Sequence, residues 1–188
     1  MEDATNESLE HREHAEHAAH TGNPLIIKVS VTIAVLAVVA ATVGSLETIE
    51  SGAAISKKSE SVLVQNRATD QWSYFQAQSI KKNLYDIAKQ SDPSRAEAYE
   101  AKARDYQTQS DETKAKATEL GRQSDELVAE GDHREHRHHV LTVGVTLLHV
   151  SIAIATIAII MQGRTWPWHG SMILGAVGAA TAAYAYLV

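Results

Sequence analysis

The chain has 188 residues, a net charge of -6 at neutral pH and no cysteine. The lack of cysteine excludes disulfide bonds and thiol catalysis. The mean hydropathy of -0.21 averages two different populations, because three runs of about 20 residues carry a single charge, Lys28, while the rest is strongly polar. Runs of that length match the thickness of a bilayer, so we expect an integral membrane protein rather than a soluble helical bundle.

The N-terminal 23 residues form an acidic tail with four histidines at a spacing of three. These are His11, His14, His17 and His20. Such a register is able to bind zinc, copper or nickel loosely, although a solvated tail without metal fits the same composition. The acidic residues do not fit a cleaved signal peptide. We therefore expect the following run, 24–46, to be retained as the first transmembrane helix, with Pro24 in its first turn.

A long polar segment, 47–139, follows this helix. Its one proline, Pro93, stands after Ser91 and Asp92 as the first helical residue stands after its cap. A turn near 91–93 divides the segment into two arms of similar length, as a helical hairpin needs if both ends are to return to the same membrane face. In the second arm a heptad stripe predicts the packing seam. It comprises Ala96, Tyr99, Ala103, Tyr106, Ser110, Thr113, Ala117, Leu120, Ser124, Leu127 and Gly131.

The corresponding stripe in the first arm is less regular. It runs through Val62, Asn66, Thr69, Ser73, Ala77, Ile80, Leu84 and Ile87. Trp72 and Phe75 fall on a neighbouring face, and rings of that size favour burial. We expect a second copy of the chain to cover them; the alternative is that both fold over the seam of the hairpin.

Two further apolar runs predict a second transmembrane helix at 140–162 and a third at 170–188, joined by a short turn at 163–169. In the third run Gly175, Ala179 and Ala183 recur every four residues, a spacing that permits close helix contact, so we expect them in an oligomer contact. The predicted fold is all-α: three transmembrane helices, with a long antiparallel, coiled-coil-like hairpin between the first and the second.

The two ends of such a hairpin lie side by side, which brings Glu47 and Glu50 near His136 and His139. Two imidazoles and two carboxylates are able to hold a divalent metal ion or relay a proton, so these four residues are the candidate metal site. The alternative is a solvated, charged collar that also includes Arg134, Glu135 and Arg137. His149 lies inside the second span, where an ionisable side chain is a functional candidate; the simpler interpretation is a hydrogen bond to a neighbouring helix.

No motif of a nucleotide-binding, hydrolase or metalloprotease site occurs in the sequence. There is also no basic stripe of the kind that binds nucleic acid. We therefore expect no enzymatic activity, no catalytic residue and no cofactor other than the possible metal ion. The expected partners are the lipid bilayer, further copies of the chain and a protein bound to the hairpin. The predicted function is a homo-oligomeric scaffold or interaction platform, and the alternatives are a pore or ion-handling assembly and a metal-binding or sensing protein.

Two stretches, 42–50 (TVGSLETIE) and 59–85 (SESVLVQNRATDQWSYFQAQSIKKNLY), resemble the bacterial integral membrane family catalogued as domain of unknown function 4337. The His- and Glu-rich tail and the three-span layout are similar as well, so the resemblance covers nearly the whole chain. It implies a multi-pass protein of the bacterial inner membrane. It supplies no activity, cofactor or functional residue.

Overall fold

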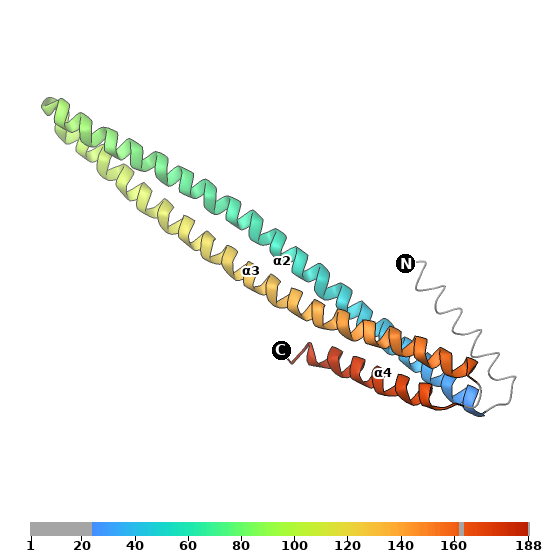
Figure 1. Cartoon of the computed structure of the whole chain (residues 1–188). Helices are drawn as coiled ribbons and strands as arrows, with labels where there is room; N and C mark the ends of the chain where they lie inside the picture. Colours follow the sequence, from blue (N-terminus) through green and yellow to red (C-terminus); the bar gives the residue numbers. More distant parts are fainter. Residues whose placement is uncertain (1–23, 162–163, 188) are drawn as a thin grey trace. The chain divides into compact units, whose positions relative to one another are not determined.

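The computed structural model describes residues 24–161 and 164–187. All described secondary structure is helical, which confirms the predicted all-α class (Figure 1). The elements are α2 (Pro24–Ser91), the 3-10 helix η1 (Pro93–Arg95), α3 (Ala96–Ile160) and α4 (Trp166–Tyr184). The N-terminal tail with its histidine register lies outside the described residues.

Helix α2 continues for 68 residues because no proline follows Pro24 until Pro93. It ends at Ser91, and Asp92 then caps η1 by accepting a hydrogen bond from the Ser94 amide at 3.1 Å. Pro93 occupies the first turn of η1, where its missing N–H leaves no hydrogen bond unmade. Local sequence chemistry thus explains why the chain changes direction between α2 and α3.

The chain divides into two compact units. We call the first the apolar unit; its described residues are 24–52, 134–161 and 164–187. The second, the polar unit, is 53–133. It consists of a first arm, residues 53–91 of α2, and a second arm, residues 96–133 of α3, joined through η1.

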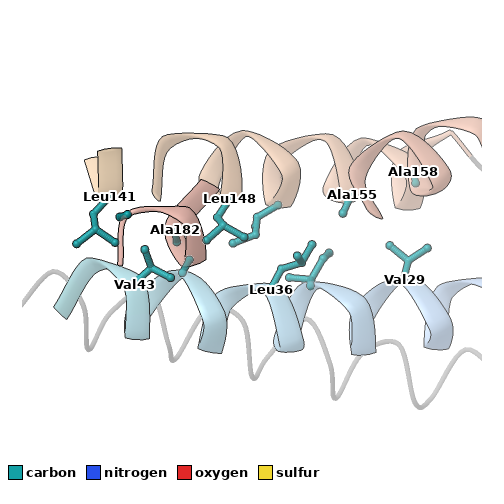
Figure 2. Packing of buried hydrophobic residues seen from close by; sticks show 12 residues of the cluster. Val29, Leu36, Val43, Leu141, Leu148, Ala155, Ala158 and Ala182 are labelled. Carbon is teal, nitrogen blue, oxygen red and sulfur yellow. The ribbon is translucent and has the colours of Figure 1, made fainter. Parts of the chain in front are cut away.

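The apolar unit has one hydrophobic core, to which α2, α3 and α4 all contribute. Figure 2 shows side chains of α2, among them Val29 and Leu36, pointing toward side chains of α3 such as Leu148 and Ala155. The α2 residues of this core, Val29, Ile33, Leu36, Ala40 and Val43, alternate spacings of three and four, which keeps them on one face of the helix.

Helix α4 packs closely on α3 through glycine. A Cβ atom added to Gly144 would lie 3.0 Å from the carbonyl oxygen of Gly178, and one added to Gly178 would lie 3.0 Å from that of Gly144. A Cβ on Gly175 would meet Leu36 of α2 at 2.5 Å. The Trp168 indole N–H also donates to the hydroxyl of Thr32 in α2 at 3.0 Å. Small residues therefore bring α4 to backbone distance from α3 and let the Leu36 side chain of α2 pack against Gly175.

In the polar unit the two arms contact each other in antiparallel order. Going toward η1, paired contacts join Lys57 to Glu130 at 3.0 Å, Gln78 to Gln109 at 3.4 Å and Lys89 to Glu100 at 2.7 Å. Many of the side chains between the arms are small or polar, and all eleven residues of the stripe predicted for the second arm are buried or half-buried. The seam therefore combines close approach with hydrogen bonding.

The stripe predicted for the first arm is wrong, because all eight of its residues are exposed. The residues that face the second arm lie on another side of the helix and include Ala54, Ser61, Ala68, Phe75 and Gln78. The aliphatic residues had been taken to mark the seam. Ala54, Ser61, Ala68 and Gln78 are buried there, so small and hydrogen-bonding side chains mark the seam of this arm better than its aliphatic ones.

Two described helical segments, Pro24–Ser91 and Pro93–Ile160, are long and apolar enough, by length and composition, to cross a membrane. Helix α4 does not meet the same measure. Its 19 residues begin with Trp-Pro-Trp-His, and these polar or weakly hydrophobic residues lower the mean hydropathy of the helix as a whole.

Candidate functional site

A buried carboxylate lies at the end of the apolar unit's core. Glu50 of α2 is 5% exposed, and its two oxygens bind two arginines of α3. Oε2 accepts from Arg134 at 3.2 Å and Oε1 accepts from Arg137 at 3.1 Å. A carboxylate removed from water needs such charge-assisted partners, since an unpaired buried charge costs several kcal/mol or more. We call Glu50, Arg134 and Arg137 the Glu50 cluster.

Arg137 also holds the end of α4. Its Nε donates to the carbonyl oxygen of Ala185 at 3.2 Å, and its guanidinium lies 5.0 Å from the centre of the Tyr186 ring. Ala185 is the residue just after α4, where carbonyl groups lack partners within the helix and the negative end of the helix dipole attracts a cation. One side chain therefore binds α2, the end of α4 and an aromatic face.

A second polar group lies beside this cluster on the same two helices. The Glu47 carboxylate contacts Nδ1 of His138 at 3.1 Å and accepts a hydrogen bond from the Thr142 hydroxyl at 3.1 Å. The His138 ring in turn lies 5.5 Å from the ring of His139. Both glutamates are thus held by α3 at neighbouring turns.

The Glu50 cluster is suited to binding helices together. The Glu50 oxygens are occupied by guanidinium groups, which do not release protons at physiological pH. Two nitrogens of the Arg137 side chain, Nη1 and Nε, donate to Glu50 and to the Ala185 carbonyl. The Glu50 cluster therefore joins α2, α3 and the end of α4 through charged hydrogen bonds.

The residues predicted as a metal site are only partly brought together. Glu47 and Glu50 do lie against α3, but their contacts are with His138, Arg134 and Arg137. His136 and His139 are exposed. Among residues 24–161 and 164–187, no group of three or more histidine and acidic side chains is arranged to hold a metal ion. The metal site stays a prediction.

The residues predicted for oligomer contact fall into different environments. Phe75 is half-buried between the arms, and the Trp72 ring packs against it edge to face with centroids 5.6 Å apart. Gly175 is buried against α2 and α3 within one chain, whereas Ala183 is exposed and Ala179 is half-buried. A role of these five residues between copies stays a prediction.

A family model described as a domain of unknown function, DUF4337, matches residues 25–188. The chain belongs to this family. No curated protein and no solved structure matches the chain. The family assignment confirms the resemblance seen in the sequence, and it brings no activity with it.

For this DUF4337 member the sequence placed Arg134 and Arg137 only in the alternative, a solvated collar, and did not predict that they bind a buried Glu50. A signal for them was present. Continued past Gly131, the alternating spacing of the second-arm stripe reaches Arg134, His138 and Leu141, which are half-buried or buried on the side of α3 that faces α2. His136 and His139 lie off that stripe, which explains why they do not meet the glutamates.

Proposed function

We propose that the chain is a non-enzymatic, multi-pass protein of the bacterial inner membrane, and that it works as a homo-oligomeric scaffold. In this proposal the apolar unit lies in the bilayer. The polar unit is a coiled-coil-like hairpin in water that presents an interaction surface.

The surface of the apolar unit supports a place in lipid. In the most apolar windows of α2 and of Pro93–Ile160, only 28% and 33% of residues are buried. Large aliphatic side chains point outward, such as Val38 at 67% and Ile173 at 68% exposed. A soluble protein rarely leaves such a continuous apolar surface in water, whereas lipid chains cover it without cost.

The dimensions of α4 support a third crossing. Its 19 residues reach about 28 Å at 1.5 Å per residue, close to the thickness of a hydrocarbon core. Aromatic residues stand at both of its ends, Trp166 and Trp168 at one and Tyr184 and Tyr186 at the other. Tryptophan and tyrosine are enriched at the two interfaces of a membrane, so this distribution fits a spanning helix.

One observation carries the scaffold function, a row of exposed aliphatic residues on the first arm. We call it the first-arm stripe; it comprises Ile55, Val62, Leu63, Ile80, Leu84 and Ile87, each between 58% and 65% exposed. They lie on the arm proposed to be in water, where lipid does not cover them. Fully burying one such side chain contributes about 1.5 to 3 kcal/mol. Because these six side chains are already partly covered, covering the rest of the stripe contributes on the order of 5 to 10 kcal/mol.

Charge favours a second copy as the occupant of the first-arm stripe. The first arm carries six basic and three acidic residues, and the second arm carries five basic and ten acidic residues. The basic arm of one copy is therefore attracted to the acidic arm of another, in addition to the apolar contact. Because each copy offers both arms, the same contact repeats around a closed assembly.

The test is the mass of the assembly. Chemical crosslinking in native membranes, followed by mass measurement in mild detergent, should give a multiple of the chain mass of 20.4 kDa. Changing Leu84 and Ile87 to Gln should lower the crosslinked fraction, because it removes apolar contact and adds no charge. Raising the salt concentration should also lower it, since salt screens attraction between exposed charges.

Thr108→Gln with Thr118→Gln is the matched control, because both threonines are exposed on the second arm and bond only to carbonyls of their own helix. This variant should keep the mass of the unmodified protein. A protein that is monomeric in membranes and in detergent rules out the scaffold as proposed. An assembly that survives the Leu84 and Ile87 changes places the contact away from the first-arm stripe.

A further inference from the structure

A row of polar and small side chains runs along the most apolar part of α3. We call it the α3 stripe; it comprises Thr142, Thr146, His149, Ala153 and Thr156, all exposed and spaced alternately by four and three. This spacing keeps them on one face of the helix. The argument that follows rests on the proposal that this part of α3 lies in the membrane.

The threonines of the α3 stripe need no outside partner. The hydroxyls of Thr146 and Thr156 donate to the carbonyls of Thr142 and Ile152, at 2.8 and 3.0 Å. The Thr142 hydroxyl has two acceptors within the chain, the His138 carbonyl at 3.0 Å and the Glu47 carboxylate at 3.1 Å. His149 differs, because within the part of the chain that the structure describes its imidazole has no hydrogen bond, ion pair or ring contact. It is the polar group on this face that still requires a partner.

The depth of His149 makes lipid an unsuitable partner. The uncharged run of α3 extends over 140–161. At about 1.5 Å per residue, His149 lies about 13 Å from one end of the run and about 18 Å from the other, farther than an imidazole reaches. Hydrocarbon offers no hydrogen bond, so an imidazole at this depth is expected to meet protein or water.

We infer that a second copy of the chain packs on the α3 stripe, with the His149 side chains of two copies meeting across the contact. A neutral imidazole carries one N–H donor and one acceptor nitrogen, so one N–H···N hydrogen bond can join the two rings. The side chains beside them are small, which permits the helices to approach closely. The stripe is thus self-complementary, as a contact between identical copies requires.

The experiment uses the absence of cysteine, which makes any introduced thiol the sole one in the chain. Thr146→Cys keeps His149 and lies on the same face of α3. Oxidation of native membranes carrying this variant should convert most of the chain into a disulfide-linked dimer. Val150→Cys is the matched control, because Val150 is 45% exposed on the same helix at the same depth but off the stripe. It should give only background dimer.

A second variant tests the imidazole itself. Adding His149→Phe to Thr146→Cys should weaken the association about threefold to tenfold, the loss expected for one hydrogen bond between helices in lipid. Equal crosslinking at positions 146 and 150, or no crosslinking at 146, overturns the inference; the latter is expected if lipid or residues 1–23 of the same chain cover the stripe. If the crosslinked assembly described above persists in that case, the scaffold stands and this contact alone is wrong.

Discussion

In the apolar unit a glutamate that is 5% exposed binds two arginines of another helix, whereas in the polar unit Arg122 binds Glu119 and Glu126 on the open surface of its own helix. The residue types are the same, and the surroundings differ. Glu50 has lost its water and depends on its partners, while Glu119 keeps water as an alternative. Ion pairs that look alike in a sequence are therefore expected to contribute very differently to stability.

Removing an arginine from each unit should separate the two cases most clearly. Arg137→Ala leaves Glu50 with one arginine fewer and removes the donor to Ala185, so we expect it to lower stability by about 3 kcal/mol and Tm by several degrees. Arg122→Ala should lower Tm much less than Arg137→Ala does, because its partners remain hydrated. Thermal unfolding in mild detergent measures both. Equal shifts for the two variants would contradict the distinction drawn here.

Glycines should show the same contrast with a smaller effect. Gly144→Ala places a Cβ atom 3.0 Å from the Gly178 carbonyl oxygen, so we expect a loss of about 1 to 3 kcal/mol from crowding. Gly121 in the polar unit has no atom within 4 Å of the added Cβ, and there alanine should stabilise the helix by about 0.5 to 1 kcal/mol. The two Tm shifts should have opposite signs. A stabilising Gly144→Ala would mean that α3 and α4 are not in close contact.

The smallest expected effect is the pH response of the exposed pair. Hydrogen bonds from Arg122 and then Gln123 lower the pKa of Glu119 from its ordinary 4.5 to about 2. Because the folded pKa is the lower one, the pair stabilises the fold above pH 4.5, and this contribution disappears as the pH falls from 4.5 to about 2. An NMR titration of Glu119 should report the low value, and Arg122→Ala should return it toward 4.5. An unchanged titration in the variant would assign the shift to another neighbour.

The polar arms show what a heptad pattern predicts and what it leaves open. The second-arm stripe was found because its spacing never varies and every second position is small, and its residues are buried or half-buried in the structure. The seam predicted for the first arm was wrong because apolarity was used as the guide. In that arm Ile80 and Leu84 are 60% exposed, while Gln78 is buried and bonded to Thr113. Hydropathy identifies a face that needs covering, and it does not say what covers it.

The sequence predicted where the candidate site lies, but not which side chains of α3 bind the two glutamates. The distance along the chain from the turn placed Glu47 and Glu50 beside α3 correctly, because two helices of equal rise stay in register. The choice of His136 and His139 ignored which side of α3 faces α2. The alternating spacing of three and four residues, continued past Gly131, selects Arg134 and His138 instead. The contact of Arg137 with Ala185 and Tyr186 depends on the position of α4, which no local pattern in α3 encodes.

The several partners of Arg137 bear on how sequences of this family are expected to diverge. If Glu50 is replaced by a neutral residue, Arg137 still has the Ala185 carbonyl to donate to and the Tyr186 ring to lie against. If Arg137 is replaced, Glu50 loses one of its two arginines and the end of α4 loses its donor at the same time. Exchanging the charges of the two residues does not restore the contact either, because a carboxylate at position 137 would repel the carbonyl oxygen. Evolutionary change in this cluster is therefore expected to be asymmetric, with arginine retained at position 137 in lineages that have already lost the acid at position 50.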